Sequence, residues 1–353
     1  MKKLYQDTTF YLIVFIISYF IYVYPFEILN ELIFNDFSNR RLSLYYTLII
    51  SVLVIFYFRS KNTFLPLKFF VYEGMGVGFV SFWIVNLVLV FKYFFSINEY
   101  ILGLFALISI LIISFYALVH SRLLFLKNIK ISSKKIYQNH NFIFISDLHL
   151  GSNSTVHLKK ILKKIQTIDY DFILIGGDLI DSSSYEINNL SLFKKIDKPI
   201  FFVTGNHEYY ISEYKAKLEQ LNNFRIKILD NKSSPINDIN LIGISDNQSS
   251  KEQSNNFFQL IDESKFNLLL VHKPSIWNQV KDNVDLMLSG HTHNGQIFPF
   301  NFLVRLKFKY KYGLYKNADS YLYVSSGSGC WGPRMRLGTS NEIINIELSQ
   351  YRE

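Results

Sequence analysis

Five short motifs rich in Asp, Asn and His each follow an apolar run of the chain. The motifs are Asp147-Leu148-His149, Gly177-Asp178, Gly205-Asn206-His207-Glu208, Val271-His272 and Gly290-His291-Thr292-His293. The apolar runs cover residues 142–146, 172–175, 200–203, 268–271 and 285–288, and each has the length of a buried strand. Ligands of open α/β sheets bind beyond the carboxyl ends of the strands. We therefore expect all five motifs at one edge of one sheet.

The residue types in these motifs suit divalent transition metals. Imidazole nitrogen binds Zn, Fe, Mn and Ni, and carboxylate oxygen favours the harder ions of that group. Two Asp, one Asn and at least four His exceed the coordination shell of one ion, so the count predicts two ions that share a bridging carboxylate. Two metals about 3.5–4 Å apart are common in phosphoryl transfer. Such a site is net positive, holds hydroxide at neutral pH and attracts phosphate.

The order of the motifs resembles the calcineurin-like metallophosphoesterases, whose pattern is D-x-H, GD, GNH(D/E), H and GHxH. The sequence is most similar to the membrane-bound bacterial branch, which carries GHTHxGQ and a later WGPxxRLG. Here those stretches are residues 290–296 and 331–338. Arg334 departs from the branch, where Pro or a small residue is usual. The resemblance covers about residues 140–350 and implies a sandwich of two mixed sheets flanked by helices.

The resemblance also implies a role for each residue. One ion would be bound by Asp147, His149, Asp178 and His293, and the other by Asp178, Asn206, His272 and His291. His207 would contact the phosphate and stabilise or protonate the leaving oxygen, without binding metal. These ligands accept Mn, Fe, Zn or Ni. We also expect Arg334 and Arg336 near the substrate phosphate, because guanidinium binds phosphate through two parallel hydrogen bonds.

Other polar residues have simpler structural explanations. Asp181 fits a helix cap or a loop-fixing carboxylate better than a ligand, and Glu208 fits a position behind the ligands. In segment 305–312, Arg or Lys alternates with apolar or aromatic residues, which predicts a strand with its cations on one face. That strand is either an edge strand protected by lysine or a basic ridge facing a membrane.

The N-terminal part of the chain has a different composition. Apolar stretches at 10–29, 42–58, 74–95 and 100–119 predict four transmembrane helices. Their few ionisable residues favour an anchor and packing scaffold over a conduction path. We expect an all-α transmembrane region at 1–120, a basic juxtamembrane linker at 121–140 and an α/β metallophosphoesterase domain at 141–353.

The charge distribution and the cysteine content bear on the partners and the covalent links of the protein. The net charge is +9, and residues 1–135 contribute 13 basic and 6 acidic side chains, so the basicity is mostly a property of the membrane region. This distribution suits an anionic leaflet and gives no reason to expect a nucleic-acid partner. Cys330 is the only cysteine, so no intrachain disulfide forms.

Together these features predict a multi-pass inner-membrane enzyme that cleaves a phosphodiester or pyrophosphate bond by metal-activated hydroxide. A site beside a bilayer favours a lipid-linked phosphate substrate. UDP-2,3-diacylglucosamine is the leading candidate, because membrane-bound relatives in the resembled family cleave it. One alternative is a general phosphodiesterase acting on soluble nucleotides or glycerophosphodiesters. Another is a membrane sensor that only binds its ligand, which loss of a metal ligand would favour; no ligand position is lost here.

The catalytic domain is predicted to be cytoplasmic. Ten Lys or Arg residues flank the spans on the side of the N-terminus and three on the other side, and cytoplasmic loops carry the excess. A reporter fused after Glu353 should therefore behave as cytoplasmic, and one inserted near Asn35 as external. An external signal from the C-terminal fusion would overturn the orientation and remove cytosolic substrates from consideration.

Overall fold

The computed structural model describes residues 2–36, 39–60 and 65–351, and the chain divides into two compact units. Unit 1 comprises Met1–Val119 together with Gly332–Met335. Unit 2 comprises His120–Trp331 and Arg336–Glu353. The chain therefore leaves unit 2 after Trp331 and returns to it at Arg336.

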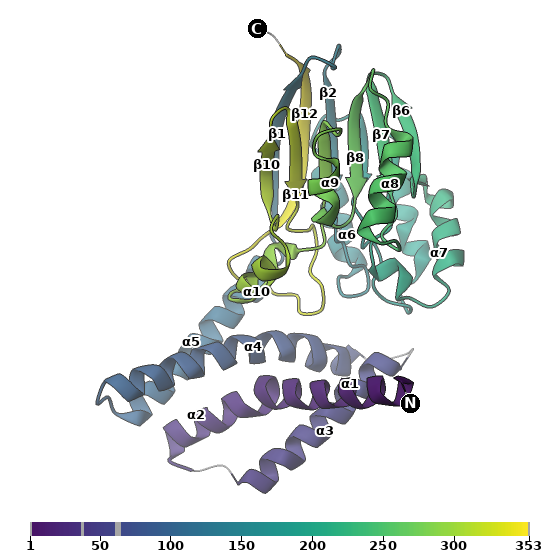
Figure 1. Cartoon of the computed structure of the whole chain (residues 1–353). Coiled ribbons are helices and arrows are strands. Elements are labelled where there is room, and N and C mark those ends of the chain that lie inside the picture. Colours follow the sequence, from purple (N-terminus) through teal and green to yellow (C-terminus); the bar gives the residue numbers. More distant parts are fainter. Residues whose placement is uncertain (1, 37–38, 61–64, 352–353) are drawn as a thin grey trace. The chain divides into compact units, whose positions relative to one another are not determined.

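Within the described residues, unit 1 has four stretches of helix long and apolar enough to cross a membrane: Thr8–Phe34, Arg40–Arg59, Leu65–Phe94 and Glu99–His120. The first joins α1 (Lys2–Ser18), a π-helical turn (Tyr19–Val23) and α2 (Tyr24–Phe34); the others are α3, α4 and α5 (Figure 1). Pro25 lies in the first turn of α2 and has no N–H to donate, which accounts for the altered hydrogen-bond ladder just before it.

Glycines let the helices of unit 1 approach closely. A side chain at Gly78 would collide with the backbone carbonyl of Ile21, and one at Gly74 would meet the ring of Tyr22. Small residues at such contacts are typical of packed membrane helices. Asn86 donates to Phe82 O at 2.7 Å and accepts from the Tyr24 hydroxyl at 3.1 Å, so its amide serves helix packing.

The segment Gly332–Met335 packs within unit 1. Arg334 Nε lies 2.5 Å from Glu73 Oε1, and the Glu73 side chain is only 4% exposed. Met335 is fully buried, and a side chain at Gly76 of α4 would collide with Met335 and Pro333. Arg334 was expected near the substrate phosphate, but its guanidinium neutralises a buried carboxylate of α4 instead. Glu73 lies inside a helix that begins at Leu65.

Unit 2 contains two six-stranded mixed sheets. The first has the order β1 (Leu124–Ser133), β12 (Asn341–Gln350), β2 (His140–Ile145), β3 (Phe172–Ile175), β4 (Ile200–Phe202) and β5 (Ile226–Ile228). The second has the order β10 (Gly313–Asn317), β11 (Ser320–Val324), β9 (Leu286–Ser289), β8 (Phe266–Val271), β7 (Ile239–Ile244) and β6 (Lys232–Ile236). Strands β2 to β5 run parallel, as do β7, β8, β9 and β11. This is the sandwich of two mixed sheets that the family resemblance implied.

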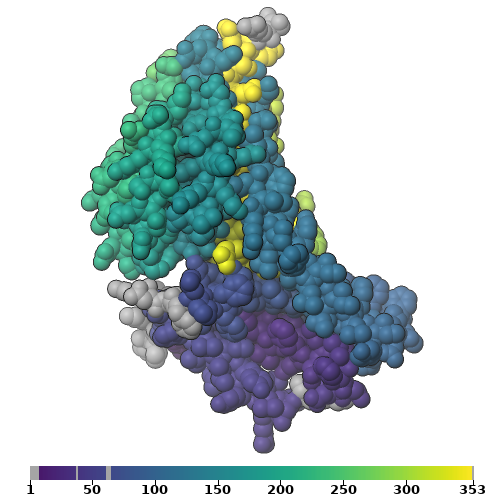
Figure 2. Space-filling view, turned by 180° about the vertical axis from the view of Figure 1, so that it is seen from behind, coloured from purple at the N-terminus to yellow at the C-terminus, as the bar shows by residue number. Residues whose placement is uncertain are grey.

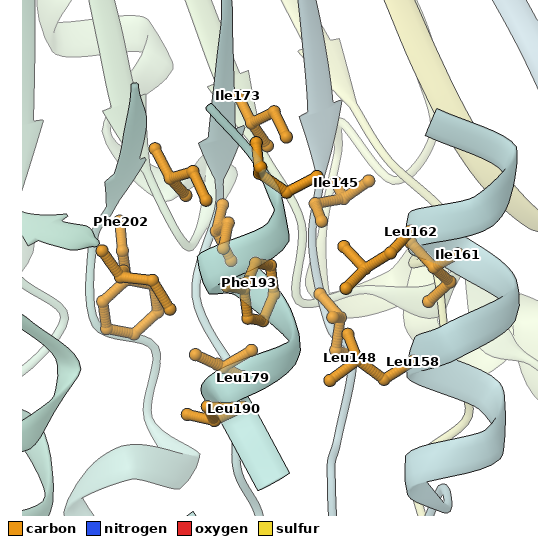
Figure 3. Packing of buried hydrophobic residues seen from close by; sticks show 14 of the residues in the cluster. Ile145, Leu148, Leu158, Ile161, Leu162, Ile173, Leu179, Leu190, Phe193 and Phe202 are labelled. Carbon is orange, nitrogen blue, oxygen red and sulfur yellow. The ribbon is translucent and has the colours of Figure 1, made fainter. Parts of the chain in front are cut away.

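Alternating side chains of the strands build three apolar layers. Phe142 and Phe144 of β2 pack between the two sheets, whereas Ile143 and Ile145 face the outside of the first sheet. There they meet α6 (Thr155–Ile165) and a 3-10 helix at Ile187–Lys195 (Figure 3). Figure 2 shows this side of unit 2 from behind, with a narrow yellow stripe of the C-terminal segment beside the teal outer layer. Helices α8 (Ser250–Leu260) and α9 (Trp277–Val280) cover the second sheet (Figure 1).

Two segments differ from the sequence expectation. The stretch 121–140, expected to be a linker, contains β1, which pairs along its whole length with β12. The basic residues of this stretch led to the prediction of a linker. The stretch nevertheless forms a strand, and its Ile131 is buried in the core between the sheets. The stretch 305–312, expected to be a strand, instead ends α10 (Phe300–Lys307) and continues without regular structure up to β10. Helical hydrogen bonds after Pro299 override the alternating pattern, and Phe308 N still donates to Val304 O.

The five motifs lie at the carboxyl ends of strands from two sheets. The first three follow β2, β3 and β4 of the first sheet, and the last two follow β8 and β9 of the second. The expectation of a single sheet was wrong, because the apolar runs carry no information on which strands pair. The metal motifs therefore meet where the ends of the two sheets converge.

The Arg334–Glu73 pair gives a test of how unit 1 is stabilised. Arg334→Ala leaves the buried Glu73 carboxylate without its cation. Adding Glu73→Gln in the same chain removes the unpaired negative charge. We expect Arg334→Ala to destabilise the detergent-solubilised protein by about 2 kcal/mol, less than for a fully buried pair because the Arg334 side chain is 48% exposed. Adding Glu73→Gln should restore most of the melting temperature.

The matched control is Arg225→Ala. Arg225 pairs with Asp197 at 3.3 Å, but the Asp197 side chain is 95% exposed, so its loss should leave the melting temperature nearly unchanged. Equal melting temperatures for Arg334→Ala and Arg225→Ala would show that the buried pair contributes nothing.

Candidate metal centre

The loops that carry the predicted ligands have an unusual backbone. Asp147, His149, Asp178, His291 and His293 all have positive φ, between 45° and 71°. Residues other than glycine rarely adopt this left-handed backbone conformation. Each such residue costs about 1–3 kcal/mol unless its surroundings compensate. Five such residues lie in three loops. Their strained backbone directs the ligand side chains toward one point.

Glycines make room for the carboxylates. A side chain at Gly205 would collide with the carboxylate and backbone of Asp178. One at Gly290 would collide with the carboxylate of Asp147. The backbone also uses this proximity, since His207 N donates to Asp178 Oδ1 at 2.9 Å and His291 N donates to Asp147 Oδ1 at 2.9 Å. Each loop therefore positions the carboxylate of another loop.

Asp147, His149 and His293 form one cluster able to bind a metal ion. His149 Nε2 and His293 Nε2 are 3.0 Å apart, and His293 Nε2 is 3.6 Å from Asp147 Oδ1. His149 Nε2 is also 3.6 Å from Asp178 Oδ2. All four side chains are at most 10% exposed. They are the four residues expected to bind the first ion.

Asp178, His272 and His291 form a second cluster. His272 Nε2 lies 3.1 Å from Asp178 Oδ2 and 3.2 Å from His291 Nδ1. The same Asp178 oxygen thus faces both His149 of the first cluster and His272 of the second. Asn206 precedes His207 in the loop after β4, and its amide oxygen is buried with no hydrogen-bond partner among the described residues.

These distances fit divalent ions. Metal–nitrogen bonds of about 2.0–2.1 Å place neighbouring ligand atoms about 3.0–3.4 Å apart. The two nitrogen–nitrogen separations, 3.0 and 3.2 Å, fall in that range. A buried amide oxygen without a donor is costly unless a cation or another ligand occupies the space before it. The residues present therefore fit divalent metal ions.

Groups behind the ligands orient the imidazoles. His149 Nδ1 lies 3.3 Å from Asp181 Oδ2, and Asp181 Oδ1 accepts from Ser152 N at 2.9 Å. His272 Nδ1 lies 2.8 Å from the Gly176 carbonyl. A partner on one ring nitrogen leaves the lone pair of the other nitrogen for a metal. Asp181 therefore acts as the loop-fixing carboxylate that was expected, and its distinct task is to orient His149.

Glu208 fastens two of the loops to each other. It is 1% exposed, and its carboxylate accepts from Asp178 N at 3.0 Å, Gly205 N at 2.8 Å and Ile180 N at 3.0 Å. Burial, reinforced by the charge of Asp178, raises the pKa of Glu208 to about 7. The expected position behind the ligands agrees with this geometry.

The carboxylates control the charge of the neighbouring histidines. Burial lowers the pKa of His272, but the charge and hydrogen bond of Asp178, with Asp147 and Asp246, outweigh it and raise that pKa to about 10. Burial and the adjacent His272 lower the pKa of His291 to about 2. The carboxylates also raise the pKa of His149 against the effect of its burial, so protonated histidine compensates the buried carboxylates near neutral pH. An ion that replaces this proton binds more tightly as the pH rises toward 10.

His207 lies at the open side of the cluster. Its side chain is 16% exposed, and Nε2 lies 4.0 Å from Asp178 Oδ2, farther than His272 Nε2. Its ring packs edge-on against Tyr210 at 5.4 Å and Trp331 at 5.7 Å, and both aromatics are more than half exposed. Burial lowers the pKa of His207 to about 4, so the ring is neutral at pH 7 and presents one N–H.

Arg336 has a different place from the one expected. Its side chain is fully buried; Nη1 donates to His293 O at 3.0 Å, and Nη2 donates to Ser326 O and Gly329 O at 2.7 and 2.6 Å. Nε donates to Asn341 Oδ1 at 2.9 Å. These bonds use the guanidinium to hold the loop of His293 against β12, so its donors serve the backbone and not a phosphate.

Comparison with known proteins agrees with this geometry. The model of the calcineurin-like phosphoesterase family matches residues 140–295, which include all five motifs. A metallophosphoesterase of Aquifex aeolicus is 30% identical over 216 residues, covering 58% of this chain and 82% of the relative. The chain belongs to the calcineurin-like phosphoesterase family.

Two further relatives show the wider distribution of the fold. A metallophosphoesterase of Helicobacter pylori is 37% identical over 239 residues, which are 63% of this chain and 63% of the relative. A transmembrane protein with a metallophosphoesterase domain from Danio rerio is 29% identical over 230 residues, which are 59% of this chain and 53% of the relative. The chain thus spans less than two thirds of both relatives. Because the relatives include animal proteins, membership of a bacterial branch stays a prediction.

Sequence reasoning missed the aromatic rim around His207. Tyr210 follows the third motif by two residues, and Trp331 begins the later stretch at 331–338. Trp331 is held near the centre by Gln296, whose side chain accepts from Trp331 N and donates to Trp331 O, both at 2.9 Å. Gln296, at the end of the 290–296 stretch, was the sequence feature that could have indicated this contact. A side-chain amide can hydrogen-bond both the N–H and the C=O of one distant residue.

Removing the shared carboxylate tests the centre. We expect purified wild-type protein to bind up to two transition ions per chain, and Asp178→Ala to lose at least one of them, because Asp178 Oδ2 faces both histidine pairs. Elemental analysis after equilibration with Mn²⁺ measures the stoichiometry. Asp197→Ala, which removes an exposed carboxylate of unit 2, is the matched control. Two fully occupied ions in Asp178→Ala would rule out the bridging role.

Proposed function

We propose that the protein hydrolyses a phosphodiester or pyrophosphate bond of a lipid-linked substrate at a site with two divalent ions. The observation that carries the reaction class is the Asp178 carboxylate, whose Oδ2 lies 3.1 Å from His272 Nε2 and 3.6 Å from His149 Nε2. A carboxylate between two sets of neutral ligands suits two ions a few ångströms apart. The order of ligands along the chain, shared with the family, supports the same assignment.

Two bound divalent ions would supply Lewis acidity, which lowers the pKa of water and neutralises the charge that develops on the phosphate. The chain supplies position and charge. Asp147 and Asp178 carry the negative charge, and the histidines and Asn206 add neutral ligands, so a loaded site stays positive and attracts a phosphate anion. Asp181 and Gly176 hold His149 and His272 in fixed orientations.

His207 is proposed to act on the substrate and not on the ions. Its low pKa leaves the ring neutral at pH 7, and nearby cations would lower that pKa further. A neutral imidazole donates one hydrogen bond, so His207 is suited to stabilise the phosphate or the leaving oxygen as negative charge develops there. Its partial exposure, in contrast to the buried ligands, leaves it reachable for a substrate.

The rim of the site supports an amphipathic substrate. Tyr210 is 73% exposed and Trp331 is 51% exposed, and both flank His207. Aromatic rings that are open to solvent beside a phosphate site can pack on a nucleoside base or on an apolar chain. The four apolar helices of unit 1 would keep this site near a bilayer. A lipid-linked nucleotide such as UDP-2,3-diacylglucosamine offers both kinds of group.

The proposed location is the inner membrane, with unit 2 in the cytoplasm. The support is the distribution of Lys and Arg around the four helices. Four helices long and apolar enough to cross a membrane, and relatives named as transmembrane proteins, support this location. A cytoplasmic site is where nucleotide-linked lipid precursors would reach it.

His207→Ala separates chemistry from metal binding. We expect turnover to fall about 100-fold or more, the usual effect of losing a group that acts on the leaving oxygen, with metal content close to wild type. His120→Ala is the control, because His120 lies outside the cluster and its Nε2 is 3.0 Å from Ser340 Oγ. A loss of metal in proportion to activity would mean that His207 is a ligand.

The substrate class is tested on the same preparations. A lipid pyrophosphate in detergent micelles and a water-soluble phosphodiester are compared by kcat/KM, with and without chelator. We expect higher kcat/KM for the lipid substrate and loss of both activities in chelator. Preference for the soluble diester would support the general phosphodiesterase, and absence of turnover with full metal occupancy would support a sensor.

A further inference from the structure

A cluster of apolar side chains on unit 2 is exposed beside the metal motif. Phe298 is 48% exposed, Phe302 58%, Leu303 56% and Leu306 85%, and all lie in or just before α10. None of the residues of α10 is buried. In Figure 1, α10 lies at the end of the sandwich and not against the face of either sheet. Exposed apolar groups at this density are costly in water and mark a contact surface.

The helix separates apolar and basic residues. At 100° per residue, Phe302, Leu303 and Leu306 share one face, and Arg305 and Lys307 lie on either side of it. The Phe298 ring packs edge-on against Phe302 at 5.7 Å and extends the apolar face. A short helix with an apolar face bordered by cations is typical of segments that lie in the interface of a bilayer.

Charge identifies the kind of partner. Residues 296–312 include Arg305, Lys307, Lys309 and Lys311 and contain no Asp or Glu. Two copies of this surface would bring like charges together, which disfavours self-association. An anionic lipid surface complements both the cations and the apolar face. Because unit 1 supplies helices long and apolar enough to span a membrane, such a surface is always within reach of the chain.

The helix is fastened to the metal motif at both ends. A side chain at Gly295 would collide with Asn301, so the first turn of α10 packs on the loop that follows His293. After the helix, the Phe308 ring packs edge-on against His291 at 5.3 Å, and Thr292 Oγ1 donates to Lys311 O at 2.5 Å. Whatever binds α10 is therefore adjacent to the ligands His291 and His293.

We propose that α10 is an interfacial membrane-binding helix. Its Phe302–Leu303–Leu306 face enters the boundary between headgroups and acyl chains of an anionic bilayer, and Arg305 and Lys307 contact lipid phosphates. The contact places the opening of the metal site at the lipid surface. The membrane contact itself does not depend on the reaction, but its consequence, delivery of a lipid substrate to the ions, rests on the function proposed above.

The test measures lipid contact without turnover. The full-length protein carries an environment-sensitive fluorophore at Leu306→Cys and is reconstituted in vesicles of phosphatidylcholine alone or mixed equally with phosphatidylglycerol. Cys330 is 1% exposed, so unsubstituted protein should take up no label. We expect blue-shifted emission and quenching by spin-labelled lipid in the anionic vesicles. The same fluorophore at Tyr137→Cys, a site that is 72% exposed between β1 and β2, should report water in both.

Arg305→Gln with Lys307→Gln tests the electrostatic part. Each cation removed should shift the equilibrium of the Leu306 probe toward water by about fivefold at low salt in anionic vesicles, with little change in neutral ones. A Leu306 probe in water in both vesicle types would overturn the proposal. Equal quenching in neutral and anionic vesicles would overturn the role of the cations. Burial that depends on protein density and not on lipid would assign the surface to a second copy of the chain. None of these outcomes depends on enzymatic activity.

Discussion

The carboxylate of Asp178 is the interaction on which the arrangement of unit 2 depends. Its Oδ2 faces His149 from the first sheet and His272 from the second, and its Oδ1 accepts from His207 N. One buried charge therefore connects the ends of both sheets. Buried charge of this kind is tolerated only when cations or protons compensate it. Protonated His272, with His149 whose pKa is also raised, would provide that compensation, and metal ions would replace it.

The surrounding loops are held in a conformation that they would not adopt alone. Five ligand residues have left-handed backbone, and glycines at 205 and 290 are required for the close approach of carboxylates. The compensation comes from the rigid layers on which the loops begin, whose core residues are almost fully buried. Glu208 and Arg336 complete the support, because each uses a buried charged group to satisfy several backbone groups of the motif loops.

Two arginines near the end of the chain illustrate how context decides the use of a residue type. Arg334 and Arg336 are separated by one residue, yet Arg334 pairs with Glu73 in unit 1 and Arg336 holds the His293 loop in unit 2. Both were candidates for binding phosphate, because guanidinium suits phosphate and carboxylate equally well. Arg334 instead pairs with a buried carboxylate on α4, and Arg336 donates to a group of backbone carbonyls. Both sets of partners come from distant parts of the chain.

The sequence by itself determined the family motifs, the ends of the strands that carry them and the four long apolar helices. These features are local: an apolar run followed by Asp, Asn or His is readable without knowing its neighbours, and a span is readable from its length and hydropathy. Glu208 could also be placed behind the ligands and Asp181 could be read as a cap or loop-fixing carboxylate, because both lie in or next to a motif. Only the tertiary structure decided that the motifs meet between two sheets, that 124–133 is a strand paired with β12, and that 300–307 is a helix. The physical reason is that strand pairing, burial of a cation and the choice between helix and strand depend on contacts made only in the folded chain, which no local pattern contains.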